Sequence, residues 1–232
     1  MDKGYSELLS SYRRMFSMID TFHFNSRNTE KVYGEYINIP IGSQVIPITH
    51  GDVADFRKKR SYNHNVLRLG FIGSEAPYKG LPLLKGVINQ LNIGGYGNQL
   101  HLDVYGGRVG RDETCPNIHY RGRFGRVDMP MVYDSIDLLV IPSIWNETFG
   151  LTSIEAMQFG VPVLVSSKVG ARDIVQQYAP RFIFEGKEEL YNILLKLLND
   201  RTELVNYNEA IINSLWYWSL ESHSDKIVNT FY

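Results

Sequence analysis

The stretch IDLLVIPSIWNETFGLTSIEAMQFGVPVLVSS, residues 136–167, contains the pattern that decides the fold. Its first part, residues 136–143, and its last part, residues 161–167, are apolar enough to be strands covered on both faces. Between them lie a loop and an amphipathic segment that ends at Gly160 and Pro162, which is a common way for a helix to stop and a strand to begin. A strand, a helix and a second strand in this order predict a βαβ unit with parallel strands.

The same alternation extends from residue 66 toward the C-terminus. Further strands are predicted at residues 66–73, 100–107, 117–122 and 181–185, and further helices at residues 81–91, 128–135, 171–178 and 187–200. The chain is therefore expected to have an α/β fold with a doubly wound, Rossmann-like parallel sheet. Ligands of such sheets bind beyond the carboxyl ends of the strands, which makes the loops at 73–80, 106–112, 122–128 and 143–152 the candidate binding segments.

Composition excludes several classes of protein. The chain has 232 residues, 44% hydrophobic content and a formal net charge of −1, so it can bury a sizeable core and has no bulk attraction for nucleic acid. One cysteine, Cys115, supports no disulfide framework, and the six histidines show no paired metal-ligand spacing. No apolar run is long enough to span a membrane. We expect a cytoplasmic protein without a metal, associated with a membrane surface at most in the full enzyme.

The candidate loops suggest an anion site, although the usual nucleotide motifs are missing. No G-x-G-x-x-G follows a strand, and no G-x-x-x-x-G-K-[ST] occurs in the chain. One lysine, Lys79, follows the first strand of the sheet, and Gly150 leads into a helix whose amides at Leu151 and Thr152 would be free to face an anion. Taken singly, Lys79 would more often be a solvated loop residue, and Glu155 a partner of the helix dipole.

Several segments together resemble one enzyme family. The segment IPSIWNETFGLTSIEAMQFGVPVLVS, residues 141–166, resembles the E-x7-E motif of the retaining glycosyltransferases of family 4, which have the two-lobed GT-B fold. FIGSEAPYKGLPLL, residues 71–84, is similar to the glycine and lysine loop that binds the donor phosphates in that family. The resemblance covers residues 66–232, so the chain is identified as carrying the C-terminal donor-binding lobe of a group 1 glycosyltransferase.

The resemblance implies a role for each motif residue. Glu155 would accept hydrogen bonds from the ribose hydroxyls of a nucleotide diphosphate sugar such as a UDP- or GDP-sugar, whereas Glu147 would hold the transferred sugar and steady charge at its anomeric carbon. Glu147 and Lys79 are the expected catalytic residues, because Lys79 would balance charge on the leaving phosphate. Further donor-binding positions are Gly73, Ser74, Arg123, Phe124, Phe149, Gly150, Leu151 and Thr152. No metal or other cofactor is implied.

One position departs from the family pattern. Many members carry an arginine five residues before the phosphate-loop lysine, and here Ser74 takes that place. The diphosphate would then meet one side-chain cation instead of two, unless another group such as Arg108 compensates.

The family also has an N-terminal acceptor lobe that the chain does not match in full. Residues 1–65 resemble the end of such a lobe and the connector between lobes, residues 66–206 the donor-binding domain, and residues 207–232 C-terminal helices that return toward the N-terminal lobe. The segment from Ser219 onward would then pack against residues 1–50. The acceptor, a sugar, glycan or glycolipid, would be held by a lobe that is missing or is part of another chain.

Three functions remain open from the sequence. The first is the donor-binding module of a retaining hexosyltransferase in glycan biosynthesis. The second is a non-catalytic nucleotide-sugar-binding or partner-docking domain. The third is a sugar phosphorylase or a nucleotide-sugar epimerase of the same fold, which the E-x7-E spacing and the lysine loop disfavour.

Overall fold

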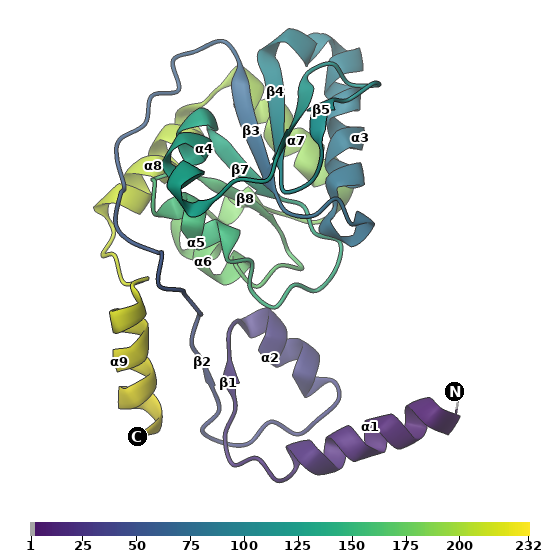
Figure 1. Ribbon diagram of the computed structural model, residues 1–232, viewed down its shortest axis with the longest axis vertical. Coiled ribbons are helices and arrows are strands. Elements are labelled where there is room, and N and C mark those ends of the chain that lie inside the picture. Colours follow the sequence, from purple (N-terminus) through teal and green to yellow (C-terminus); the bar gives the residue numbers. More distant parts are fainter. Residues whose placement is uncertain (1–2) are drawn as a thin grey trace.

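A seven-stranded sheet forms the centre of the molecule in the computed structural model, which describes residues 3–232. Its strand order is β5-β6-β4-β3-β7-β8-β9, and all neighbours are parallel except β5 and β6 (Figure 1). From β3 the chain adds strands outward to one edge and then returns to add β7, β8 and β9 on the other side. The predicted doubly wound sheet is therefore confirmed, with its switch point between β3 and β7.

The predicted strands are all present, with slightly shorter bounds: β3 (Leu67–Ile72), β4 (Leu100–Tyr105), β6 (Ile118–Gly122), β7 (Leu138–Ile141), β8 (Val163–Ser166) and β9 (Ile183–Phe184). The antiparallel edge strand β5 (Val109–Arg111) was not predicted. It has three exposed residues, one of them glycine, so it carries no apolar alternation that sequence reasoning could detect. A short, exposed and charged edge strand also discourages pairing with other chains.

Helices cover both faces of this sheet. On one face α3 (Leu81–Leu91) packs with α7 (Gly186–Asn199), and the other carries α4 (Met129–Ser135) and α5 (Thr152–Met157) (Figure 1). The chain continues through α6 (Arg172–Tyr178) and α8 (Thr202–Asn213). Burial of the apolar faces of these elements stabilises the fold, because each buried aliphatic side chain contributes about 1.5–3 kcal/mol. The fully buried side chains include Leu67, Leu69, Leu84, Ile88, Leu102 and Ile118.

The N-terminal residues lie below the carboxyl ends of the strands (Figure 1). They form α1 (Lys3–Phe16), β1 (His23–Phe24), α2 (Arg27–Gly34) and β2 (Gln44–Val45), and β1 and β2 pair as a small parallel sheet. The last helix, α9 (Leu220–Phe231), runs beside this part. Its His223 ring lies 6.0 Å from that of His23, and the Thr49 hydroxyl donates to the Trp218 carbonyl at 2.5 Å.

Helix α8 is continuous across the boundary that we expected between residues 206 and 207. Its buried side chains Leu204, Tyr207 and Ile211 belong to the core of the seven-stranded sheet and its helices, so the chain leaves this core only after Asn213. Within residues 3–232, no helix combines the length and the apolar character needed to cross a bilayer.

Candidate functional site

Two loops meet at the switch point of the sheet and bring together the expected catalytic residues. Lys79 ends the single turn η1 (Pro77–Lys79) after β3, and Glu147 lies in the loop after β7. Their side chains form an ion pair between Nζ and Oε1 although the residues are 68 positions apart. The Glu147 side chain is 12% exposed and that of Lys79 34%, so a ligand can still reach the lysine.

Backbone contacts fix the lysine loop against the loop after β7. The Tyr78 carbonyl accepts from the Ile144 amide at 3.0 Å and from the Ser143 hydroxyl at 3.0 Å. Gly80 has φ +81°, and a Cβ there would lie 1.7 Å from the Pro142 carbonyl oxygen. Only glycine permits this approach, so the sequence KG at 79–80 places Lys79 beside Glu147.

The loop that carries Glu147 is also anchored to the loop after β8. The Glu147 amide donates to the Lys168 carbonyl and its carbonyl accepts from the Gly170 amide, both at 3.0 Å. Gly150 has φ +98° and begins the turn into α5. Ser153 and Ile154 are the first residues of this turn whose amides donate backward, to the Gly150 and Leu151 carbonyls, so the amides of Leu151 and Thr152 have no intrahelical acceptor.

Glu155 lies one turn inside α5, as expected, and two side chains hold its carboxylate. Tyr133 of α4 donates its hydroxyl to Oε2 at 3.1 Å, and His50 of the connector contacts Oε1 through Nε2 at 3.1 Å. The Asp52 amide lies 3.3 Å from His50 Nδ1 and holds the ring turned toward Glu155. Burial, together with the nearby Glu155 carboxylate, raises the pKa of Tyr133 well above its usual value, so its hydroxyl stays a donor.

The other residues that were expected to bind the donor differ in their exposure and in the contacts that they make. Gly73 is tied to the sheet, because its amide donates to the Tyr105 carbonyl at 3.0 Å. Ser74 and Arg123 are exposed, and neither side chain makes a hydrogen bond or ion pair within residues 3–232. Phe124 packs edge-on against Tyr105 at 5.5 Å. The Phe149 side chain is buried in the core, so only its backbone can face a ligand.

Arg108, considered as a substitute for the missing arginine, is engaged elsewhere. Its guanidinium lies 4.0 Å from the centroid of the Tyr120 ring and 3.4 Å from Glu75 Oε2. This position is beyond the neighbouring strand β4, so the structure places Lys79 but not Arg108 beside Glu147.

Sequence reasoning missed His50 and Tyr133. Tyr133 is 22 residues from Glu155 and His50 is 105 residues away, so no local spacing reveals either contact. The only available signal for Tyr133 was a polar aromatic residue on the buried side of a short amphipathic helix, where its hydroxyl needs a partner.

The N-terminal end of α2 also contacts the loops at the carboxyl ends of the strands. Ser26 caps α2 and donates its hydroxyl to the Thr148 carbonyl at 2.6 Å, next to Glu147. Asn28 donates to the Lys168 carbonyl at 2.9 Å, and the Arg27 amide to Asp173 at 2.6 Å. The N-terminal residues are thus in contact with the candidate donor site.

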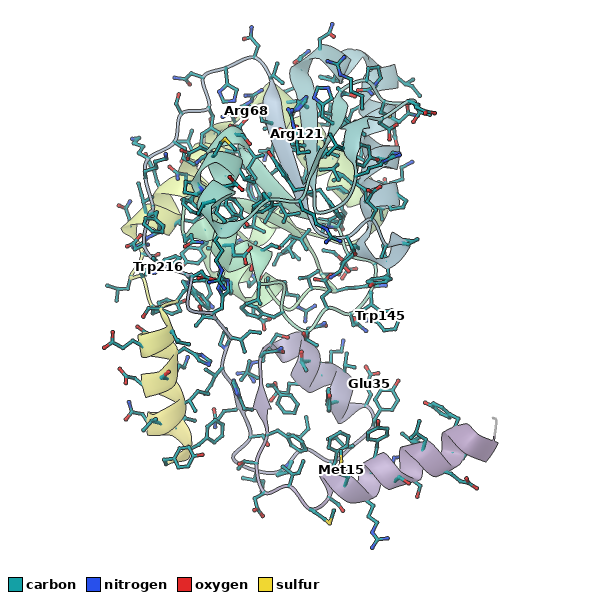
Figure 2. The ribbon with its side chains drawn as sticks, viewed as in Figure 1. Met15, Glu35, Arg68, Arg121, Trp145 and Trp216 are labelled. Carbon is teal, nitrogen blue, oxygen red and sulfur yellow. The ribbon has the colours of Figure 1, made fainter. Side chains whose placement is uncertain are left out.

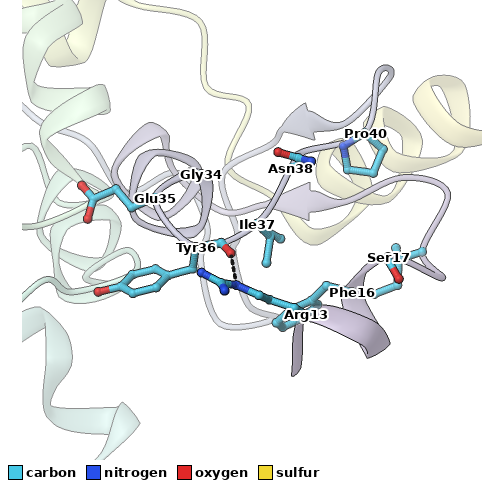
Figure 3. A pocket seen from close by; sticks show the side chains of 10 residues that line it. Arg13, Phe16, Ser17, Gly34, Glu35, Tyr36, Ile37, Asn38 and Pro40 are labelled. Atoms are coloured by element: carbon cyan, nitrogen blue, oxygen red, sulfur yellow. Dashed lines mark hydrogen bonds between the residues drawn. The ribbon is translucent and has the colours of Figure 1, made fainter. Parts of the chain in front are cut away.

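A pocket of about 550 Å³ lies on the far side of the N-terminal residues, between α1 and the segment after α2. Figure 3 shows its wall, where the Arg13 guanidinium donates to the Tyr36 carbonyl at 3.1 Å. Phe16, Ile37 and Pro40 supply its apolar part. None of the residues at the carboxyl ends of the sheet lines this pocket, so it is separate from the candidate donor site.

Comparison with known proteins agrees with this geometry. The sequence model of the family described as "Glycosyl transferases group 1" matches residues 52–214. The chain is 28% identical to D-inositol 3-phosphate glycosyltransferase from Nocardia farcinica over 182 residues, which are 72% of this chain and 40% of that protein. The chain thus spans less than half the length of this relative.

Solved structures share the fold at low identity. HepE of Anabaena in complex with UDP and glucose superimposes with a TM-score of 0.73 at 16% identity, over 96% of this chain and 66% of that one. Sucrose-phosphate synthase from Thermosynechococcus elongatus gives a TM-score of 0.71 at 17% identity, over 96% and 60% of the two chains. The family match covers more than half of the chain, so the chain belongs to the glycosyl transferases group 1 family.

Proposed function

We propose that this chain is the donor-binding part of a retaining glycosyltransferase that moves a sugar from a nucleotide diphosphate sugar to an acceptor hydroxyl. The observation that carries the proposal is the pairing of Lys79 with Glu147 at the switch point of the sheet, in the loop that leads into the helix of Glu155. Two carboxylates and one cation at this place match the needs of a ligand with a ribose, a diphosphate and a sugar. The relatives support it, because one is named as a glycosyltransferase and another was solved in complex with UDP and glucose.

Each of the three residues has a separate task in this proposal. Glu155, held by Tyr133 and His50, accepts hydrogen bonds from the ribose. Lys79 exchanges its ion pair with Glu147 for the diphosphate and stabilises the charge that develops on it as the glycosidic bond breaks. Glu147, released by Lys79, holds hydroxyls of the transferred sugar and faces the positive charge at its anomeric carbon. No step of this scheme calls for a metal.

The acceptor is assigned to a further lobe that packs on the N-terminal residues. This part exposes large apolar side chains, among them Leu8 at 55%, Met18 at 71% and Ile41 at 102% relative exposure. Exposed apolar groups in such number on one small segment mark a surface that another protein layer covers. The covering layer is the remainder of an α/β acceptor lobe, on this protein or on a second chain.

A non-catalytic nucleotide-sugar-binding domain is the second candidate. Its supporting observation is the internal pairing of Lys79 with Glu147, which leaves the site electrostatically satisfied without a ligand. Release of free sugar from a donor, even slow, favours the transferase. Binding without turnover when an acceptor lobe is supplied favours the second candidate.

Calorimetric titration tests the donor site. The chain is titrated with UDP, GDP, ADP and dTDP, and with the corresponding monophosphates, as wild type and as Lys79→Ala. We expect Lys79→Ala to weaken the diphosphate far more than the monophosphate, with a difference that shrinks as salt rises. Lys59→Ala is the matched control, because Lys59 is 73% exposed and pairs with Glu209 far from the site. Equal losses for both nucleotides would place Lys79 away from the distal phosphate.

A further inference from the structure

A second cluster of polar side chains lies on the sheet away from the candidate donor site. His101 and Asp103 of β4 and His119 of β6 each offer a ligand atom, and these atoms all lie within 4.8 Å of one another. Figure 2 shows the labelled Arg121, which contacts this cluster, far from Trp145 in the loop after β7. The cluster is thus separate from Lys79, Glu147 and Glu155.

The strand geometry explains why the three residues meet. His101 and Asp103 are two positions apart on β4, so their side chains project from the same face of the sheet. His119 is the direct partner of Asp103 in the parallel β4–β6 register, and neighbouring strands lie about 4.7–4.9 Å apart. The backbone of two rigid, parallel strands therefore sets the arrangement, rather than a mobile loop.

This face is open at the cluster although doubly wound sheets are usually covered on both faces. The chain passes from β4 to β6 through the edge strand β5 instead of a helix. α4 reaches Tyr105, whose hydroxyl lies 3.2 Å from the Ser135 hydroxyl, two residues beyond Asp103. Beyond that contact the imidazoles are partly exposed, with 21% for the His101 side chain, so an ion in solution can reach them.

The ligand atoms are almost arranged for a metal. His101 Nε2 is 2.8 Å from Asp103 Oδ1, and the two imidazole rings approach edge-on with centroids 4.5 Å apart. The His119 ring makes no hydrogen bond within residues 3–232. A buried carboxylate beside an imidazole that lacks a partner leaves a place for a cation that both can bind.

We infer that His101, Asp103 and His119 form a binding site for a divalent transition metal of the Zn²⁺ type. Two imidazole nitrogens and one carboxylate oxygen suit Zn²⁺, Co²⁺ or Ni²⁺, whereas Mg²⁺ and Ca²⁺ prefer oxygen ligands. Ligand bonds of about 2.0–2.2 Å require the 2.8 Å contact between His101 and Asp103 to open slightly and His119 to move toward the ion, which rotation of the partly exposed rings allows. Water would complete the coordination.

Arg121 competes with the metal for Asp103. Its Nε donates to Asp103 Oδ1 at 2.6 Å, and its side chain is 46% exposed, so it can turn into solvent when a metal binds. Arg111, the neighbour of His119 on β5, adds a second positive charge nearby. Removal of the Arg121 charge therefore strengthens metal binding, whereas a purely structural ion-pair network would gain nothing from it.

The test is a titration of the full chain, without an affinity tag, with Zn²⁺ alone after treatment with a chelator. We expect one equivalent to bind, and Co²⁺ in its place to give a visible absorption band typical of nitrogen and oxygen ligands. His119→Gln and His101→Gln should each weaken Zn²⁺ binding at least about tenfold, because even groups that only support a ligand change affinity about 10–100-fold. Arg121→Gln should tighten it.

His64→Gln is the matched control. His64 also pairs with a buried aspartate, Asp137, at 2.7 Å, but has no second histidine beside it. Its replacement should leave Zn²⁺ affinity unchanged, and circular dichroism checks that every variant is folded. Absence of stoichiometric binding, binding that persists in both His119→Gln and His101→Gln, or weaker binding in Arg121→Gln would overturn the inference. UDP titration of the same variants reports separately on the donor site.

Discussion

The seven-stranded sheet with its helices and the N-terminal residues differ in how far they bury their apolar side chains. Between residues 53 and 218 the buried apolar side chains form one continuous cluster, and the exposed ones, such as Ile93, Val127 and Trp145, are scattered over separate loops and helices. In residues 5–41, by contrast, Tyr5, Leu8, Tyr12, Met15, Met18, Tyr33, Tyr36 and Ile41 are all exposed. At the carboxyl ends of the sheet, Lys79 is paired with Glu147. In our proposal the part with the closed core binds a small ligand, and the part with exposed apolar side chains binds another protein layer.

The largest expected effect concerns transfer. The chain alone should bind a sugar nucleotide but transfer sugar negligibly, because correct placement of an acceptor accounts for about 7–11 kcal/mol of a reaction barrier. Addition of an N-terminal acceptor lobe, fused or in trans, should restore transfer with little change in donor affinity. Radiolabelled sugar transfer and calorimetry measure the two quantities.

Sugar transfer by the chain alone at ordinary enzymatic rates would contradict our proposal that a further lobe holds the acceptor. The acceptor site would then have to lie within the N-terminal residues themselves or between two copies of the chain, and their exposed apolar surface would need another explanation.

Loss of one apolar side chain should destabilise the protein more in the sheet domain than in the N-terminal residues. Leu84 is fully buried and Leu8 is 55% exposed. Leu84→Ala should lower the free energy of unfolding by about 2–5 kcal/mol, and Leu8→Ala should change it by no more than about 0.5 kcal/mol. Urea unfolding followed by circular dichroism measures both, and similar losses would show that α1 belongs to the same cooperative core.

Most of the sheet could be predicted from sequence because its strands are short, apolar and separated by amphipathic helices. The positions of β7 and β8 followed from runs such as LLVI and VLVS, which are fully buried. β5 could not be predicted, because its pairing with β6 places Gly110 opposite Tyr120 without any apolar pattern of its own. Helix α1 was not predicted, although Leu8, Tyr12 and Met15 repeat at helical spacing.

The candidate site was predictable where motif and loop coincide and not where it depends on distant contacts. Lys79 and Glu147 were expected to act together, and the structure joins them. The contact of Glu155 with His50 depends on the path of the connector, which no residue pattern determines. The cluster of His101, Asp103 and His119 arises from the register of two strands. Because His119 lies on a different strand from the other two, the sequence shows no spacing typical of metal ligands.

In our proposal Glu155 binds the ribose and Glu147 the transferred sugar, so their removal should have unequal effects. Glu155→Ala should weaken nucleotide binding by about 1.5–3 kcal/mol, the usual value for hydrogen bonds to a charged group. Glu147→Ala should not weaken the binding of a free nucleotide, since the proposed partner of Glu147 is the transferred sugar and its loss leaves Lys79 free for the diphosphate. Calorimetry with UDP or GDP distinguishes the two, and equal losses would show that the division of tasks is wrong.

The smallest expected effect tests whether a buried residue of the sheet domain orients Glu155 in the proposed donor site. Tyr133 is fully buried, stacks on Phe159 at 5.3 Å and donates to Glu155, so Tyr133→Phe keeps the packing and removes one bond to the carboxylate. We expect nucleotide affinity to fall by about 0.5–1.5 kcal/mol, the net value of one hydrogen bond. Because the pKa of Tyr133 is raised, the protonated donor persists across the neutral range, and the loss should not vary with pH between 6 and 9. Tyr105→Phe is the control, since its hydroxyl meets Ser135 and not Glu155. An equal loss of nucleotide affinity in Tyr105→Phe would mean that the effect comes from a general loosening of α4, whereas a loss confined to Tyr133→Phe shows that the buried layer orients Glu155.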